Sequence, residues 1–78
     1  MIPLTWLRAW EVGVVQDISG KPGFVSRISA TGFSLNTEVK MIRNWKWGPL
    51  IIFLRDTQIA LGRTEAGNIM VRKKSESK

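Results

Sequence analysis

Five consecutive large apolar residues, Leu50 to Leu54, form the longest uninterrupted hydrophobic run of this 78-residue chain. The run lies between two residue pairs that are typical of turns, Gly48-Pro49 and Asp56-Thr57. Successive side chains of a strand point to opposite faces, so a strand over residues 50–56 is predicted to be covered on both faces. In so short a chain, five short strands, one helix and tight turns favour a small barrel over an open sheet, because closure removes edge strands.

Other short segments also have the composition of strands. Residues 11–18, 37–44, 58–61 and 69–73 are rich in β-branched residues or alternate between apolar and polar residues. A helix is expected to begin near Pro22, which suits a first helical turn, and to stop at Gly32. Leu35-Asn36 favours a type II turn, because Asn tolerates a positive φ. One helical turn is expected to begin near Thr64.

The fold class expected from this order of elements is mainly β. We predict a small SH3-like barrel of about five strands, with one inserted α-helix and a short helical turn before the last strand. The barrel domain is predicted to span residues 1–73. Residues 74–78 are predicted to be a disordered basic tail, because they include no apolar residue. The expected core consists of Phe24, Ile28, Val39, Met41, Ile52, Leu54, Ile59, Leu61 and Ile69.

The residue types in the chain exclude most catalytic and metal chemistry. There is no cysteine and no histidine, so a zinc knuckle, a thiol nucleophile and an imidazole base are all excluded. The six Asp and Glu residues are scattered singly, without the spacing of a calcium loop or of a paired acid and base. We therefore predict that the chain is not an enzyme, and that it has no cofactor and no metal site.

No membrane insertion is expected. A run of five apolar residues is far shorter than the ~20 that a spanning helix needs. The first residues, MIPLTWLRAWEVGVV, lack a basic start and include Arg8 and Glu11, unlike a signal peptide. The localisation expected from these features is cytoplasmic. The net charge is +6, and half of it lies in residues 72–78, so the rest of the chain is only mildly basic.

A pattern of glycine, proline and apolar residues runs through residues 30–71, ATGFSLNTEVKMIRNWKWGPLIIFLRDTQIALGRTEAGNIMV. Its members are Gly32, Val39, Gly48, Pro49, Ile59, Ala60, Leu61, Ala66, Ile69 and Val71. The pattern resembles that of the FeoA family, which are small cytoplasmic SH3-like proteins associated with bacterial ferrous iron transport. The family reads helix, Leu-Gly-Leu-x-Pro-Gly-x-x-Val, a hairpin with Gly-(x)-Pro, Ile-Ala-Leu-Arg, and Ala-x-x-Ile-x-Val. None of the matching residues is chemically reactive, so the resemblance implies a fold more than a chemistry.

The chain departs from the family pattern in its turns. Leu35-Asn36 stands where the family usually has Pro-Gly, and Gly62 where it usually has Arg. Trp10 stands where a turn glycine is usual, and Trp45-Lys46-Trp47 where smaller residues and proline are usual. The resemblance therefore implies a divergent member of the family.

The loop between residues 44 and 50 is the candidate binding site. Trp45, Lys46 and Trp47 follow Arg43 there, and two indoles that flank a lysine in a short loop are difficult to bury together. Loops on a rigid scaffold often hold binding residues. In the alternative reading, one indole packs across the strands over Phe53, or Trp47 caps the barrel over Leu50.

Arg55 and Arg63 complete the candidate partner-binding set. The alternative for them, as for Arg43, is a solvated barrel face without a partner.

Two classes of function compete. The resemblance implies a protein-interaction module, an accessory or regulator that docks on the cytoplasmic G-protein portion of a FeoB-type ferrous iron transporter. The alternative is a small basic barrel that binds single-stranded nucleic acid by stacking bases on exposed aromatic side chains. We favour the interaction module, because half of the charge lies in the tail and the aromatic residues have no RNA-binding motif around them. Weak nucleic-acid binding stays open.

Overall fold

The computed structural model describes residues 1–74, which form six strands, two α-helices and one 3-10 helix. In chain order the elements are β1 (Ile2–Pro3), η1 (Leu4–Trp6), β2 (Val12–Ile18), α1 (Pro22–Ala30), β3 (Glu38–Arg43), β4 (Leu50–Leu54), β5 (Thr57–Leu61), α2 (Arg63–Ala66) and β6 (Ile69–Lys73). The mainly β fold with an inserted helix and a helical turn before the last strand is as predicted. The two-residue strand β1 and the helix η1 were not predicted, because segments this short have no measurable periodicity.

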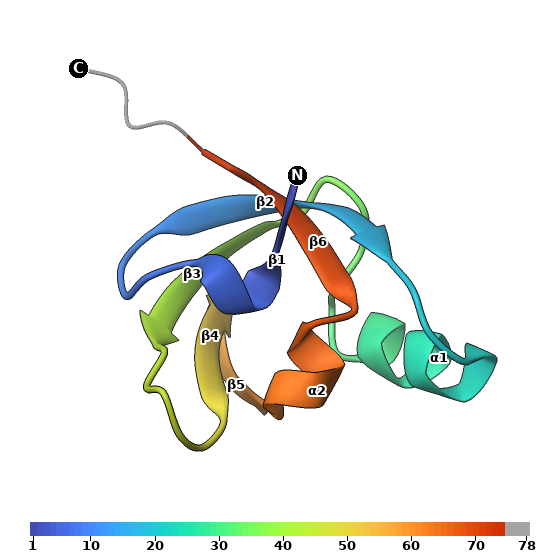
Figure 1. The fold of residues 1–78 in the computed structure, drawn as a ribbon. Helices are drawn as coiled ribbons and strands as arrows, with labels where there is room; N and C mark the ends of the chain where they lie inside the picture. The colour runs from blue at the N-terminus through green and yellow to red at the C-terminus, as the bar shows by residue number, and fades with distance from the viewer. Residues whose placement is uncertain (75–78) are drawn as a thin grey trace.

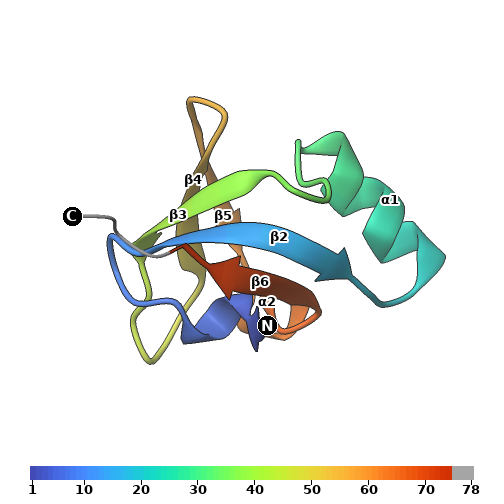
Figure 2. The ribbon, with the colours of Figure 1, turned by 90° about the horizontal axis from the view of Figure 1, so that it is seen from above.

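All strand pairs are antiparallel, and the strands lie in the order β1-β6-β2-β3-β4-β5. The sheet curls around a single core, as Figures 1 and 2 show. Two register shifts bend it, one in β2 between Val15 and Asp17 and one in β3 between Met41 and Arg43. An extra residue at such a bulge increases the local twist, which helps a small sheet to close.

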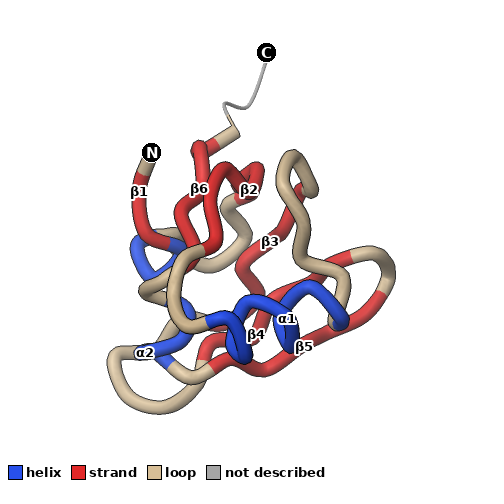
Figure 3. Tube along the Cα trace, turned by 90° about the vertical axis from the view of Figure 1, so that its right-hand side faces the viewer, coloured by secondary structure: helices blue, strands red, loops and turns tan. Residues whose placement is uncertain are grey.

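The longer helix lies at one end of the barrel, and the two short helices lie at the open edges of the sheet. α1 crosses one end of the barrel and is in front of the strands in Figure 3. Its Arg27 forms an ion pair with Glu65 of α2, which ties the two helices together. α2 follows the edge strand β5, and η1 follows the other edge strand β1; the two short helices contact one another. The unpaired edges are thereby partly covered.

The core is continuous and apolar. Seven of the nine predicted core residues are buried, and the remaining two, Phe24 and Ile59, are half-buried and packed against the core. In β3 the alternation is as expected, since Val39 and Met41 are buried while Glu38 and Lys40 are exposed. Several core residues were not predicted, and the largest of them are Leu4, Leu7, Phe33 and Leu50.

Two expectations about the β4–β5 hairpin were wrong. Only one face of β4 is fully covered, because Phe53 on the other face is 38% exposed. The turn consists of Arg55 and Asp56 instead of Asp56-Thr57, and Leu54 pairs with Thr57. Arg55 and Asp56 both have positive φ, 50° and 65°, as the central residues of a type I′ turn do. The sequence offered no glycine here, so the turn was placed one residue too late.

The turn after α1 is as predicted. Asn36 has a φ of 72°, and the amide of Thr37 donates to the carbonyl of Ser34 at 3.2 Å. The amide of Asn36 also donates to the carbonyl of Val15 at 2.7 Å, which fixes the turn to β2.

The last described residue, Lys74, is held by the barrel. Its amide donates to the carbonyl of Val12 at 2.8 Å, and its ammonium lies 2.6 Å from the carboxylate of Glu38. Lys74 had been assigned to the basic tail from the sequence. The remainder of that tail, residues 75–78, lies outside the described residues.

Candidate functional site

The β3–β4 loop presents both of its tryptophans to solvent. Trp45 is 63% exposed and Trp47 is 81% exposed, while Leu50 at the start of β4 is fully buried. The alternative in which Trp47 caps the barrel over Leu50 is therefore wrong. Gly48 has a φ of 88°, which lets the chain turn back into β4 at a point where a residue with a Cβ would be strained.

Basic side chains surround these indoles. The guanidinium carbon of Arg43 lies 4.2 Å from the centroid of the Trp45 ring, which is a cation–π arrangement. Lys46 is exposed between the two tryptophans. Four of the predicted site residues thus lie together. Arg43 is at the end of β3, and Trp45, Lys46 and Trp47 are on the loop that follows it.

Arg63 is not an exposed surface residue, and its side chain has a structural role. It lies at the start of α2, half-buried, and its guanidinium donates to the side-chain oxygen of Asn44 at 2.6 Å. The side-chain nitrogen of Asn44 donates to the carbonyls of Thr5 and Leu7, at 2.9 and 2.5 Å. Arg63 therefore helps to hold the β3–β4 loop in place through its hydrogen bond to Asn44.

The same contacts bring a second pair of tryptophans to this end of the barrel. Trp6 and Trp10 are each 67% exposed; Trp6 lies between the two residues that Asn44 binds, and Trp10 follows three residues after them. In Figure 2 this segment and the β3–β4 loop both lie on the side of the molecule away from α1. We call this surface the tryptophan end; its members are Trp6, Trp10, Trp45 and Trp47.

Trp10 has an unusual backbone conformation. Its φ is 74°, in the left-handed region, which costs a residue with a Cβ roughly 1–2 kcal/mol. Its amide donates to the carbonyl of Met41 at 2.6 Å, and the amide of Met41 donates to the carbonyl of Glu11 at 2.9 Å. The ammonium of Lys40 lies 6.0 Å from the Trp10 ring centroid.

The one carboxylate beside Trp10 is already engaged. Glu11 lies 2.6 Å from the ammonium of Lys73 and accepts a hydrogen bond from the amide of Arg8 at 2.8 Å. The Lys73 ammonium first, and then the Arg8 amide, hold the pKa of the Glu11 carboxyl below its ordinary value of 4.5. Glu11 is thus ionised at neutral pH, and its charge is balanced by Lys73.

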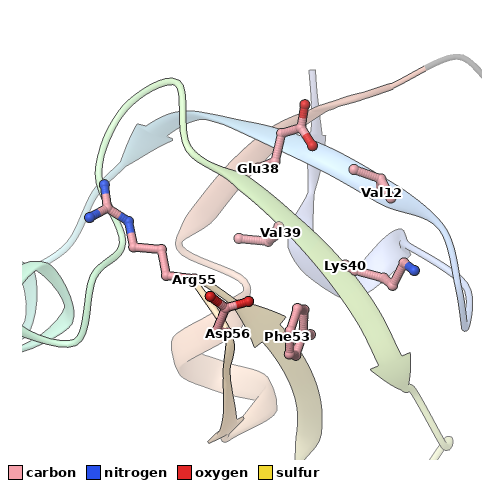
Figure 4. A pocket seen from close by; sticks show the side chains of 7 residues that line it. All are labelled: Val12, Glu38, Val39, Lys40, Phe53, Arg55 and Asp56. Carbon is pink, nitrogen blue, oxygen red and sulfur yellow. The ribbon is translucent and has the colours of Figure 1, made fainter.

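Arg55 lies apart from the tryptophan end, in the β4–β5 turn. It borders a hollow of about 330 Å³ between β2, β3 and this turn, shown in Figure 4. The hollow is lined by Val12, Glu38, Val39, Lys40, Phe53, Arg55 and Asp56. Its lining includes no hydroxyl, thiol or imidazole side chain, and its charges are mixed.

Within residues 1–74, no three His, Cys, Asp or Glu side chains come close enough to hold a metal ion. In the same part of the chain, no helix is long and apolar enough to cross a membrane.

Comparison with known proteins accounts for the fold. The sequence profile of the FeoA domain matches residues 2–73, nearly the whole chain. The chain belongs to the FeoA family. A protein of Methanocaldococcus jannaschii named "Putative Fe(2+) transport protein A" is 35% identical to it over 71 residues, which are 91% of this chain and 85% of the relative.

Solved FeoA structures superpose closely on the chain. The crystal structure of an iron uptake regulatory protein, FeoA, has a TM-score of 0.88 at 26% identity and covers 94% of this chain and 97% of that one. FeoA of Stenotrophomonas maltophilia, solved with zinc and named a prokaryotic SH3 domain protein, has a TM-score of 0.77 at 26% identity, over 91% and 89% of the two chains. The predicted SH3-like barrel is confirmed. FeoA proteins are accessory transport proteins, so this chain is not an enzyme.

Reasoning from the sequence missed Trp6 and Trp10 as surface residues. The available signal was the presence of Trp10 where FeoA proteins usually have a turn glycine. The backbone of such a turn favours glycine and gives no reason for a large apolar side chain. A tryptophan at this position is therefore expected either to lie on the surface or to make a new contact.

Proposed function

We propose that this FeoA-family chain is a non-catalytic accessory of FeoB-type ferrous iron transport, which docks from the cytoplasmic side on the G-protein portion of the transporter. Family membership supports the link to ferrous iron transport. The observation that carries the docking proposal is the exposure of Trp45 and Trp47 on a loop whose backbone is fixed by Asn44. A tryptophan on a rigid loop supplies a large contact area at little cost in conformational entropy.

The contact surface proposed is Arg43, Trp45, Lys46 and Trp47. Trp45 and Trp47 supply apolar area, and Arg43 and Lys46 supply positive charge that steers an acidic partner surface toward the loop. Arg55 remains a candidate for a separate contact at the β4–β5 turn. Arg63 contributes by holding Asn44, and through it the loop.

The test is binding of the purified G-protein portion of the transporter from the same organism to the immobilised chain. Trp45→Ala is expected to weaken this binding by ~1–3 kcal/mol while the domain stays folded. Phe53→Ala is the matched control, since Phe53 is also a partly exposed aromatic but lies in the hollow of Figure 4. Absence of binding by the wild type, or equal binding by Trp45→Ala, contradicts the proposal.

A second candidate function is supported by the same exposed indoles. Trp45 and Trp47 beside Arg43 and Lys46 have the combination of stacking surfaces and positive charge that single-stranded nucleic acids bind. A mobility shift with mixed-sequence single-stranded RNA that weakens steeply with salt would support this function.

A further inference from the structure

The presence of a tryptophan at position 10 is explained neither by the backbone nor by packing. The amide of Glu11 donates to the carbonyl of Arg8 at 3.0 Å, and this turn accounts for the positive φ of Trp10 but not for its side chain. At a φ of 74° the position favours glycine, yet it carries the largest side chain, and that side chain is 67% exposed. A Trp here therefore adds strain without filling the core. Residues with a strained backbone are often found at functional sites. The strained conformation of Trp10 therefore points to a function of its exposed side chain.

The segment around Trp10 is anchored by one buried residue and is exposed on both sides of it. Leu7 is fully buried and anchors the segment, while Trp6, Arg8 and Trp10 are exposed. The amide of Trp10 is fixed to Met41 of β3. Two exposed indoles, with Arg8 between them in the sequence, thus lie on a segment that is tied to β3.

The charge around this segment is positive. Arg8 lies within it, and the Lys40 ammonium is 6.0 Å from the Trp10 ring. Glu11, the one carboxylate in residues 1–12, is neutralised by Lys73. An anionic surface can therefore approach Trp6 and Trp10 without meeting an uncompensated negative charge.

We propose that Trp6, Arg8, Trp10 and Lys40 form a surface that rests on the anionic phospholipid headgroups of a membrane. The indole is the side chain best suited to the headgroup layer, because its ring is apolar and its N–H donates a hydrogen bond. Arg8 and Lys40 are placed to contact lipid phosphates. This is peripheral contact and needs no spanning segment.

A bilayer fits this surface better than a protein pocket does. Lys40 borders the hollow of Figure 4 together with Phe53, and neither Trp6 nor Trp10 is among the residues that line that hollow. A protein partner would have to supply a separate pocket for each indole, whereas every part of a headgroup layer offers both apolar and phosphate groups.

This inference rests on the proposed function, because docking on a transporter brings the domain to a membrane. The two contacts use neighbouring parts of the tryptophan end. Trp45 and Trp47 face the transporter, and Trp6 and Trp10 face the lipid beside it. Each contact alone is weak, and their combination raises the effective concentration of the domain at the transporter.

The test is flotation of the chain with vesicles of phosphatidylcholine that contain phosphatidylglycerol as the anionic lipid, compared with phosphatidylcholine alone. The wild type is expected to float with the anionic vesicles and much less with the neutral ones. Trp6→Ala combined with Trp10→Gly is expected to lower the partition coefficient by at least about tenfold. Arg8→Gln is expected to lower it roughly fivefold on anionic vesicles and to have no effect on neutral ones.

Two features of the design separate lipid contact from misfolding. Trp10→Gly relieves a left-handed conformation, so this change is expected to leave the fold intact. Leu35→Ser is the matched control: Leu35 is a 59% exposed apolar residue in the turn after α1, and its loss should leave flotation unchanged.

Binding to the soluble G-protein portion, measured without membranes, separates this proposal from the proposed function. The Trp6/Trp10 variant is expected to keep that binding while it loses the vesicles. Failure of the wild type to float with anionic vesicles overturns the lipid proposal, as does a double variant that floats like the wild type. A double variant that loses the G-protein portion instead would show that this surface contacts protein.

Discussion

The guanidinium of Arg63 donates a hydrogen bond to the side-chain oxygen of Asn44 over 2.6 Å, and this bond joins α2 to the β3–β4 loop. The amide nitrogen of Asn44 extends the link to the carbonyls of Thr5 and Leu7. One side chain thus connects three segments that are distant in sequence. The bond to Asn44 comes from the Nη2 atom of Arg63, while its Nε atom is buried and has no hydrogen-bond partner among the described residues.

Asn44→Ala is expected to destabilise the domain by about 2 kcal/mol, because it removes three hydrogen bonds and leaves a buried guanidinium unpaired. Urea unfolding followed by circular dichroism measures the change. Lys46→Ala, two residues later on the same loop, is the control and should change stability by less than ~0.5 kcal/mol. Equal stability of the two variants would show that the network adds little.

The β4–β5 turn should be improvable. Arg55 and Asp56 both have positive φ, a conformation that Asn-Gly adopts with less strain. Replacing them together with Asn and Gly is expected to raise the free energy of unfolding by ~1 kcal/mol or more. Thermal unfolding tests this. A decrease in melting temperature would mean that the Arg55 side chain makes a stabilising contact outside the turn.

Acid should weaken the native state partly through Glu11. Its pKa is lowered in the folded chain by Lys73 and by the Arg8 amide, so the unfolded chain binds a proton more readily. The stabilisation from Glu11 is therefore complete above its ordinary value of 4.5 and is lost as the pH falls through the lower, folded pKa. Unfolding curves of the wild type and Glu11→Gln should converge on acidification. A difference that stays constant with pH contradicts this assignment.

No tight ferrous or zinc site is expected on the monomer. The chain has no Cys or His, and within residues 1–74 its carboxylates form no cluster of three. Titration calorimetry with Fe²⁺ under anaerobic conditions, and separately with Zn²⁺, should give no one-to-one binding in the low micromolar range. Such binding would require ligands that the barrel does not bring together.

The elements with strong local signals could be predicted from the sequence. Pro22 and Gly32 bracketed α1, and alternation marked β3. The turn at Asn36 was predictable because Asn is one of few residues that tolerate a left-handed conformation. In each of these places, local preference and the final fold agree.

The features that were missed depend on contacts between distant segments. Leu4 and Leu7 lie in a 3-10 turn too short for periodicity, and they become core residues only because the sheet closes over them. The part played by Arg63 follows from Asn44, 19 residues away. The Arg55-Asp56 turn lacked the glycine that usually marks its type.

The sequence does not determine whether the indoles of Trp45 and Trp47 are exposed, and the structure shows that they are. Trp45 and Trp47 could also have packed on the barrel, because aromatic side chains stabilise a sheet when they pair across strands. Arg43 is exposed at the end of β3, and its guanidinium lies over the Trp45 ring. This contact partly explains why the Trp45 indole lies at the surface.

All four tryptophans of the chain are at least 63% exposed, so none of them occupies the core. Indole emission responds to the water around the ring, and here the native protein already surrounds each ring with water. Unfolding should therefore shift the intrinsic fluorescence very little, although most small domains report their unfolding in this way. Because the rings are exposed, a partner or a membrane that covers that end of the barrel should change their emission. The fluorescence can therefore be used to measure binding.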